Sequence, residues 1–262
     1  MQPMLSIAVK AARRAANVII RGSLDMEMNK VEVTRKSSND YVTSVDFAAE
    51  QAIIEVLQEA YPDHAILSEE TGLIGDEHAE YQWIVDPLDG TRNFVHNIPD
   101  YVVSIAVLKN GVAQHAVVFD PIRNEMFTAS RGSGTFLNDR RVRVSSCRSL
   151  QEGILVGRLP IFSKADQTVR TEFLTLMKSM AAYRQFGSSI LELAYIAAGR
   201  IDALCNYNLR PWDLAAGVLL IQEAGGLVGD YKGEQSWQEK QEIIAGNPRV
   251  FAKMVQVLNT EA

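Results

Sequence analysis

The sequence predicts a fold of the α+β or α/β class, with helices first, an antiparallel sheet next and mixed α/β structure from residue 150 onward. Apolar residues recur at helical spacing in the first part of the chain. Short runs rich in Val, Ile and Phe follow, separated by Gly, Pro and Asn turns, and helical spacing then returns. With 262 residues, 47% of them hydrophobic, the chain can bury a sizeable core.

Two amphipathic helices are predicted near the N-terminus. One face of the first carries Lys10, Arg13 and Arg14. The opposite face comprises Leu5, Val9, Ala12, Ala16 and Ile19. A polar, turn-rich segment at 36–46 follows, and the second helix stops before Pro62 because proline ends a helix. Asp46 is therefore expected at or next to a helix N-terminus.

The middle of the chain predicts the antiparallel sheet from the runs AILSEE, WIVD, VVSIAVL, AQHAVVFD and EMFTAS. In the second half, ILVGRL is expected as a strand, and helices are expected through Phe173 and over 188–198. A further helix follows the PWD segment and ends at Gly225, which is typical of a helix C-terminus. Asn247 and Pro248 are typical of the start of a last helix.

These elements predict two lobes that pack against each other with a cleft between them. The first is an N-terminal α+β lobe at 1–145 with the antiparallel sheet, and the second is a C-terminal α/β lobe at 146–262.

Composition excludes several classes of function. The net charge of −6 argues against a protein whose main task is to coat nucleic acid. The longest apolar runs are too short to cross a bilayer and the N-terminus has no signal-peptide pattern, so a cytoplasmic protein is expected. Cys147 and Cys205 lie far apart without CxxC spacing, which favours structural thiols over a zinc site or a disulfide framework.

The segment WIVDPLDGTRNF at 83–94 carries the strongest chemical pattern. A strand that ends in Asp86, followed by a turn with Asp89, holds two carboxylates at one end of a sheet, where Gly90 allows a tight bend. Like charges this close repel, so the arrangement makes sense if a cation lies between them, and hard oxygen ligands suit Mg²⁺. The alternative is a plain turn after a strand with solvated acids.

Three further acids occupy well-ordered positions. Glu69 follows the apolar run AIL, while Asp46 and Asp213 each stand at a predicted helix start. An isolated acid at a helix N-terminus is usually only a cap. The collection is nevertheless consistent with one shared site.

Several segments together resemble a known family: MLSIAVKAARRAA, KSSNDYVTSVD, SEETG, WIVDPLDGTRNF, the GSS at 187–189, LRPWDLAAG, EAGG and AGNPRV. Through them nearly the whole chain resembles the inositol monophosphatase family of magnesium-dependent, lithium-sensitive phosphatases. The pattern WxxDPxDGTxNF with a later PWDxAAG is highly specific. The resemblance implies a five-layer αβαβα sandwich and a homodimer.

The resemblance also implies roles for individual residues. The Mg²⁺ ligands would be Glu69, Asp86, Asp89, Asp213 and the carbonyl oxygen of Leu88. Thr91, paired with Asp46, would position or deprotonate a metal-bound water, with Glu69 as a further catalytic residue. The substrate-binding residues would be Asp89, Gly90, Thr91, Gly187, Ser188, Ser189, Asn206 and Asp213. Lys36 would lie in a loop that closes over the site.

Two positions depart from the family pattern. The usual DGTTNF is DGTRNF here, so Arg92 replaces a small neutral residue and is expected to bind an anion, obstruct the site or face outward. Asn206 stands where relatives that hydrolyse inositol phosphates carry a glutamate that binds substrate hydroxyls. An amide lacks the charge-assisted strength of a carboxylate, which weakens the case for inositol as the main substrate.

Two functions of different classes follow. The first is a Mg²⁺-dependent phosphomonoesterase that acts on myo-inositol 1-phosphate or related small polyol or sugar phosphates. The second comes from a bacterial branch of the family that takes part in ribosomal RNA transcription antitermination, and hence in ribosome biogenesis, with Nus factors and RNA polymerase.

The second function needs a binding surface, and direct RNA binding is left open. Basic surface is available at Lys10, Arg13, Arg14, Arg140, Arg141 and Arg143. The plainer interpretation of each cluster is an ordinary solvated face.

A third hypothesis takes DPLDGT as a relative of the DxDGT phosphotransferase loop, with Asp86 as the phosphorylated nucleophile. The spacing is one residue too long for that loop.

Overall fold

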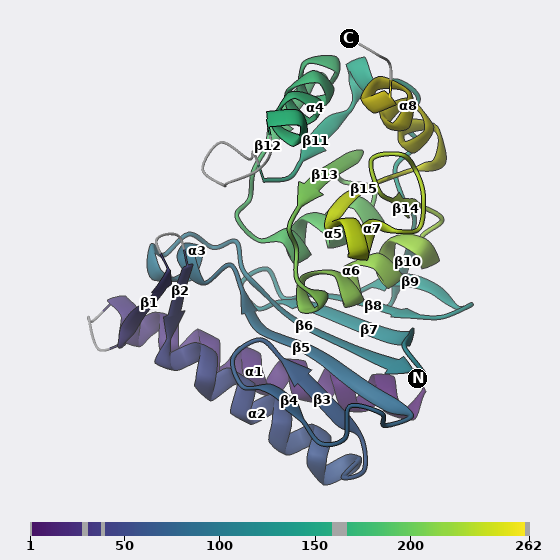
Figure 1. Cartoon of the computed structure of the whole chain (residues 1–262). Coiled ribbons are helices and arrows are strands. Elements are labelled where there is room, and N and C mark those ends of the chain that lie inside the picture. Colours follow the sequence, from purple (N-terminus) through teal and green to yellow (C-terminus); the bar gives the residue numbers. More distant parts are fainter. Residues whose placement is uncertain (1, 28–30, 38–39, 159–166, 260–262) are drawn as a thin grey trace.

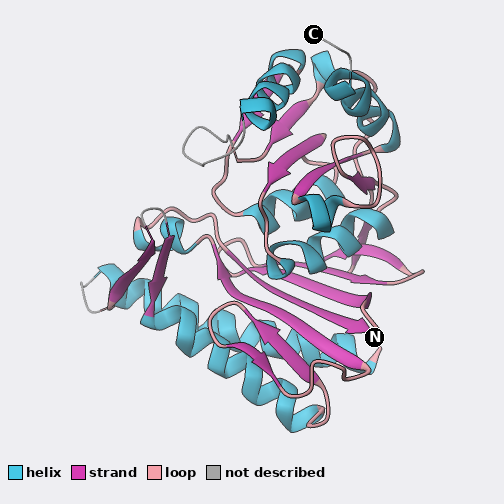
Figure 2. Cartoon of the chain, viewed as in Figure 1, coloured by secondary structure: helices cyan, strands magenta, loops and turns pink. Residues whose placement is uncertain are grey.

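The chain folds into five layers of secondary structure, in the order helix pair, sheet, helix pair, sheet, helix pair (Figures 1 and 2). The computed structural model describes residues 2–27, 31–37, 40–158 and 167–259. The αβαβα sandwich implied by the family resemblance is therefore confirmed.

The first layer pairs α1 (Pro3–Glu27) with α2 (Ser44–Ala60). Their apolar faces pack on each other and on the first sheet, as the helical spacing predicts. The helices approach closely at Gly22, where an added Cβ would lie 2.5 Å from the Val45 side chain. Along the chain, an antiparallel hairpin of β1 (Val33–Ser37) and β2 (Asp40–Thr43) comes between the two helices.

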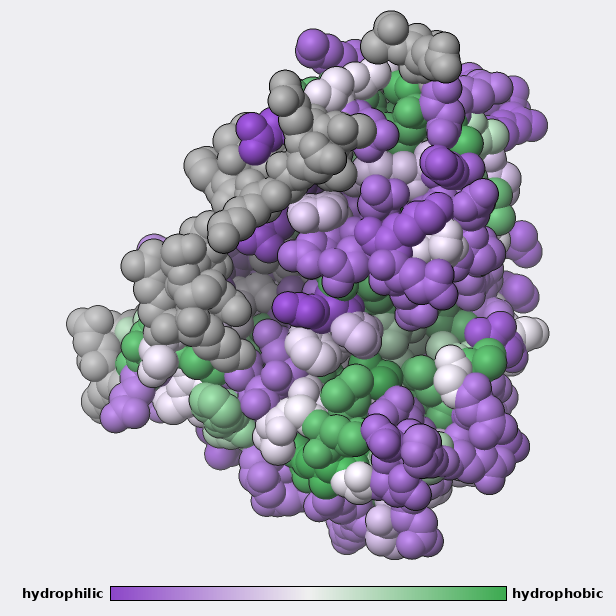
Figure 3. All heavy atoms as spheres, in the orientation of Figure 1, coloured by the Kyte–Doolittle hydropathy of each residue, from purple (hydrophilic) through white to green (hydrophobic). Residues whose placement is uncertain are grey.

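The second layer is an eight-stranded sheet in the order β10-β9-β8-β7-β6-β5-β3-β4. Its strands are β3 (Ala65–Ser68), β4 (Gly72–Ile74), β5 (Tyr81–Asp89), β6 (Val102–Lys109), β7 (Val112–Asp120), β8 (Glu125–Ser130), β9 (Gly134–Leu137) and β10 (Arg140–Val142). Figure 3 shows polar residues over most of one face, with apolar residues gathered near the β3–β4 edge.

The first sheet is antiparallel as predicted except at one pair, because β3 and β5 run parallel. The hairpin from β3 to β4 brings the chain back to the end of the sheet where β3 begins. A short connection then starts β5 at that same end, so β5 runs alongside β3 in the same direction.

The fourth layer is a five-stranded sheet in the order β12-β11-β13-β15-β14. Its strands are β11 (Ile154–Val156), β12 (Ala182–Arg184), β13 (Ala203–Tyr207), β14 (Leu227–Gly229) and β15 (Glu242–Gly246). The outer helices α4 (Gln167–Ser179) and α8 (Pro248–Asn259) cover its far side. As predicted, Asn247 caps α8, because its Oδ1 accepts from the backbone N–H groups of Arg249 and Val250.

The central layer consists of α5 (Ser189–Ala197) and α6 (Pro211–Glu223), which lie between the two sheets. Every residue of α5 from Ile190 to Ala197 is buried, which is typical of a helix covered on all sides. The helix α6 ends as predicted, with Gly225 in the left-handed region at φ +84°. Both helices begin at the same edge of the sandwich, where β5 ends.

Short helices complete the chain: α3 (Thr91–Val95), the 3₁₀ helix η1 (Leu150–Glu152) and α7 (Trp237–Lys240). Cys147 and Cys205 are both free thiols. Within the described residues, no helix has the length and apolar character that a membrane crossing requires. The division into lobes at 1–145 and 146–262 falls between the two sheets and stays a prediction.

Candidate active site

A pocket of about 870 Å³ opens where β5 ends and α5 and α6 begin. Most of the site residues predicted from the sequence line it: Glu69, Asp86, Leu88, Asp89, Gly90, Thr91, Gly187, Ser188, Ser189, Asn206 and Asp213. They come from both halves of the chain, so the pocket exists only after the two sheets have packed on the central helices.

Irregular backbone at the end of β5 positions the first two carboxylates. The pairing of β5 with β6 loses its register between Asp86 and Asp89, so the strand departs from regular pairing where both acids lie. The backbone N–H of Leu88 donates to Asp86 Oδ1 at 3.0 Å and fixes that carboxylate. Asp86 is 1% exposed, so its position is set by the surrounding core.

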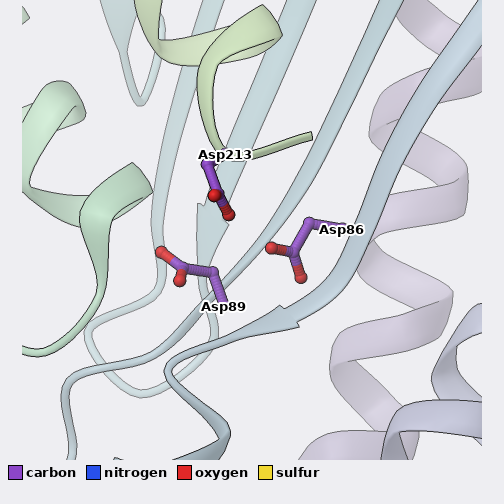
Figure 4. Close-up of side chains that lie close together, drawn as sticks. All are labelled: Asp86, Asp89 and Asp213. Atoms are coloured by element: carbon purple, nitrogen blue, oxygen red, sulfur yellow. The ribbon is translucent and has the colours of Figure 1, made fainter. Parts of the chain in front are cut away.

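The third carboxylate comes from the start of α6. Pro211 opens the helix, and the backbone N–H of Arg210 donates to Asp213 Oδ2 at 2.7 Å. Asp86, Asp89 and Asp213 each offer one oxygen, and these oxygens all lie within 4.8 Å of one another (Figure 4). Residues more than 120 positions apart thus form one group of hard oxygen donors.

The electrostatics of this group favour a bound cation. Burial, together with the charges of Glu69, Asp89 and Asp213, raises the pKa of Asp86 well above its usual range. Burial and the charge of Asp213 raise the pKa of Asp89 to about 7. A divalent cation would offset both the desolvation and the mutual repulsion, and carboxylate oxygens are the ligands that Mg²⁺ prefers. The donor set therefore fits the metal that the family resemblance implies.

Asp46 and Thr91 form a hydrogen-bonded pair beside the carboxylates. Thr91 Oγ1 lies 2.9 Å from Asp46 Oδ1, to which it donates, and 3.1 Å from the carbonyl oxygen of Leu88. Asp46 is the third residue of α2 and closes a capping box with Thr43, whose N–H and hydroxyl both donate to Asp46 Oδ2. Burial raises the pKa of Asp46, while these hydrogen bonds oppose the shift.

The start of α5 holds Asp89 from the other side of the pocket. Ser188 Oγ and the backbone N–H of Ile190 donate to Asp89 Oδ2 at 2.6 and 2.7 Å. Ser188 is among the residues predicted to bind substrate, and its hydroxyl here donates to a carboxylate of the protein and caps α5. The contact joins β5 to the central helix layer and fixes the direction of the Asp89 side chain.

Glu69 lies in the turn after β3, and a buried acid from α2 holds that turn. The Glu50 carboxylate accepts from the hydroxyls of Ser68 and Thr71 and from the backbone N–H of Glu70 at 3.0 Å. Glu50 is 1% exposed. The sequence pattern did not identify it, because an acid inside an amphipathic helix usually marks the solvated face.

Replacing Glu50 with alanine is expected to destabilise the protein and to weaken its metal-dependent activity. The change leaves several donors around Glu69 unsatisfied, which costs about 2 kcal/mol or more. Thermal unfolding and the Mg²⁺ dependence of phosphate release measure the two effects. Glu59→Ala in the same helix is the control, because its side chain is 75% exposed. Equal behaviour of the two variants would contradict the role given to Glu50.

Asn93 is a second residue that sequence reasoning missed. Its Nδ2 donates to the carbonyl oxygens of Asp100 at 2.6 Å and Phe186 at 2.7 Å, so it ties α3 to the segment before α5. Gly187 lies against it at φ +78°, where an added Cβ would be 3.0 Å from the Asn93 amide. The sequence indicated a role for Asn93 only through its position inside the DGTRNF segment.

Glu192, also missed, lines the pocket from α5. Burial and the charge of Asp89 raise the pKa of Glu192 to about 8, although the backbone N–H of Phe186 donates to its Oε1 at 2.9 Å. The apolar spacing of α5 did not indicate an acid that faces the pocket.

The remaining predicted residues lie at the margins of the site. Arg92 lines the pocket, and its guanidinium carbon lies 5.7 Å from the ring centre of Tyr41 in β2. Lys36 belongs to β1 of the same hairpin, and its side chain is outside the described part of the structure. Asn206 is buried in β13, where it lines the same pocket.

Comparisons with known proteins give one consistent result. The model of the inositol monophosphatase family matches residues 1–260. Nus factor SuhB of Pseudomonas aeruginosa is 47% identical over 264 residues, which cover 98% of this chain and 96% of that protein. The extragenic suppressor protein suhB of Bartonella henselae has a TM-score of 0.94 and 38% identity, with 100% of both chains covered. The IMPase of Thermotoga maritima has a TM-score of 0.86 and 31% identity, over 98% of this chain and 97% of that one.

Proposed function

Because this chain belongs to the inositol monophosphatase family, we propose that it is a Mg²⁺-dependent phosphomonoesterase. Its substrate is myo-inositol 1-phosphate or a related small polyol or sugar phosphate. The observation that carries the proposal is the convergence of Asp86, Asp89 and Asp213, with oxygens within 4.8 Å of one another at the base of a pocket. Lithium sensitivity and a homodimer, as in the family, are part of the proposal.

The metal would be held by the three converging carboxylates, Glu69 and the Leu88 carbonyl oxygen. Mg²⁺ bound there would neutralise phosphate oxygens, lower the pKa of the attacking water and stabilise the leaving alkoxide. The network around these ligands supports the proposal, since Ser188 and the backbone of Ile190 orient Asp89, and the backbone N–H of Arg210, which any side chain at that position leaves in place, orients Asp213.

Thr91 and Asp46 act on the attacking water. The Thr91 hydroxyl donates its proton toward Asp46, so its oxygen is free to accept a hydrogen bond from a water in the pocket. The water proton passes to the Thr91 oxygen as the hydroxyl proton passes to Asp46. The raised pKa of Asp46 makes it a better proton acceptor than an ordinary solvated carboxylate.

The substrate lies against both lobes. The backbone at Gly90 and Thr91 contacts the phosphate, and the Gly187–Ser189 segment with Asn206 forms the wall for the alcohol. The β1–β2 hairpin borders the pocket through Tyr41. Lys36 lies in strand β1 of that hairpin, and we propose that the hairpin, with Lys36, closes over the bound substrate.

Phosphate release from a panel of polyol and sugar phosphates, with Mg²⁺ and with EDTA, tests the proposal. Release that requires Mg²⁺ and follows saturation kinetics with at least one ester is expected. The panel includes myo-inositol 1-phosphate, glycerol 1-phosphate and fructose 1-phosphate. Absence of metal-dependent release from every ester would overturn the enzymatic function.

A second function is favoured by one specific observation, the full-length similarity at 47% identity to a Nus factor. We infer that the protein also binds the transcription machinery, Nus factors and RNA polymerase among them, as a regulatory factor in ribosomal RNA antitermination. Both roles place it in the cytoplasm. Recovery of Nus factors or polymerase with a tagged protein supports this role, and their consistent absence from the recovered material contradicts it.

A further inference from the structure

One part of the pocket lining is rich in hydrogen-bond donors. It is built by the ends of β11 and β13 and by the segment before α6, which supply Arg158, Asn206 and Arg210. The strands β11 and β13 are parallel neighbours, with Val156 paired to Leu204, so residues 158 and 206 leave the sheet at the same edge.

Close packing keeps this wall in place. At Gly157, φ is +141°, and an added Cβ would lie 1.8 Å from the carbonyl oxygen of Cys205. Only glycine permits this approach of the two backbones, and it holds the start of Arg158 beside Asn206. Arg210 is fixed separately, because its backbone N–H is hydrogen-bonded to Asp213.

The orientation of the Asn206 amide can be assigned from its neighbour. The backbone N–H of Tyr207 lies 3.0 Å from one amide atom of Asn206, which must be the oxygen because an N–H needs an acceptor. The NH₂ group therefore points elsewhere, and it has no hydrogen-bond partner among residues 2–27, 31–37, 40–158 and 167–259. Asn206 is 2% exposed, so this donor is confined to the pocket wall.

Neither arginine side chain is paired with a carboxylate among the described residues. Within the described part of the chain, the side chains of Arg158 and Arg210 form no hydrogen bond or ion pair, and both are exposed at the pocket. Metal and substrate phosphate would complement the carboxylate side of the pocket. Arg158, Arg210 and Asn206 then present two permanent positive charges and an amide donor that the described residues do not complement.

We propose that Arg158, Arg210 and Asn206 bind a second anionic group on the leaving alcohol of the substrate. The inference rests on the proposed phosphatase function and narrows its substrate class to phosphomonoesters that carry a further phosphate or carboxylate. A guanidinium binds either group through paired hydrogen bonds, and the pocket of about 870 Å³ accommodates a ligand of this size.

Two matched substrate pairs test the inference. Fructose 1,6-bisphosphate and fructose 1-phosphate differ by a phosphate, and 3-phosphoglycerate and glycerol 1-phosphate differ by a carboxylate. We expect kcat/KM to be about tenfold or more higher for at least one doubly anionic member, because a charge-assisted hydrogen bond contributes on that scale. The pair that shows the preference identifies the second group.

Variants connect the preference to the wall. Arg158→Gln and Arg210→Gln are each expected to lower kcat/KM for the doubly anionic substrate about tenfold, mainly through KM, and to change the matched partner less than about twofold. Arg140→Gln, an exposed arginine of β10 outside this pocket, is the control. Preference that persists in both pocket variants, or equal loss with both substrates, would overturn the inference.

Binding gives a readout that does not depend on turnover. Calorimetry with the Asp89→Asn protein is expected to show tighter binding of fructose 1,6-bisphosphate than of fructose 1-phosphate, and loss of that difference in the double variant with Arg158→Gln. Hydrolysis of both members without a preference overturns this inference and leaves the phosphatase function intact. Metal-dependent release from none of these four esters also overturns this inference, and the phosphatase function itself is overturned only if myo-inositol 1-phosphate and the rest of the panel release no phosphate either.

Discussion

Asp89→Asn is expected to abolish Mg²⁺-dependent phosphate release, with kcat lowered at least about a thousandfold, or about 4 kcal/mol. The amide oxygen can still accept from Ser188 and the backbone of Ile190, so the contact between β5 and α5 survives. The variant loses only the negative charge and one anionic ligand. Phosphate release at saturating Mg²⁺ with the best substrate of the panel is the measurement.

The stability of the metal-free variant distinguishes this loss from misfolding. The folded-state pKa of Asp89, about 7, lies above its ordinary value of 3.8, so ionisation of Asp89 destabilises the folded protein. That cost grows as pH rises from about 4 to about 7 and is fully present above it. Asparagine removes the cost, so the metal-free variant is expected to unfold at the same or a higher temperature at pH 8. Retained activity would show that Asp89 is not a ligand.

Thr91→Ala is expected to lower kcat by about 10² to 10³ with little change in KM. In the proposed mechanism the Thr91 hydroxyl, which donates to Asp46, relays the proton of the attacking water, and positioned proton transfer contributes on this scale. Asp46→Asn is expected to lower kcat as well, since an amide oxygen is a poor proton acceptor. Both effects are measured from initial rates of phosphate release at saturating Mg²⁺.

Thr91→Ser is the matched control for this prediction, because it keeps a hydroxyl at the same position of α3. It is expected to retain most of the activity. If Thr91→Ala also stays within about threefold of the unmodified protein, proton transfer through Thr91 and Asp46 is contradicted. If serine fails as alanine does, the threonine methyl group packs in a way the activity needs, and the proton-transfer role loses its support.

The sequence predicted the layers of the fold better than the pairing of its strands. Helical spacing identified both amphipathic helices of the first layer and both buried helices of the central layer. The reason is that the buried positions of a helix recur as apolar residues at regular intervals in the sequence. The parallel pairing of β3 with β5 was missed, since strand direction depends on where β4 returns the chain and a short apolar run carries no direction.

The site residues likewise divide into those that a local sequence pattern identified and those that only tertiary contacts reveal. Asp46, Glu69, Asp86, Asp89 and Asp213 were all identified as acids at the ends of ordered segments, a pattern that is local and therefore visible in the sequence. Glu50 and Asn93 were missed because their partners, the Ser68–Thr71 turn and the Phe186 carbonyl oxygen, lie far along the chain. In the sequence, a buried acid or amide inside a helix cannot be distinguished from a solvent-exposed one until its hydrogen-bond partner is known.

By itself, the sequence determined which residues carry charge, which turns are tight and which segments form helices, because backbone preference and hydrophobic period act over a few neighbours. Only the tertiary structure decided that the end of β5 meets the start of α5 and α6, so that Ser188 donates to Asp89 across 99 positions of chain. It likewise placed Arg158 beside Asn206 through the contact of Gly157 with Cys205. Such contacts depend on how whole layers pack. Their two partners lie far apart along the chain, so a local sequence pattern cannot reveal them.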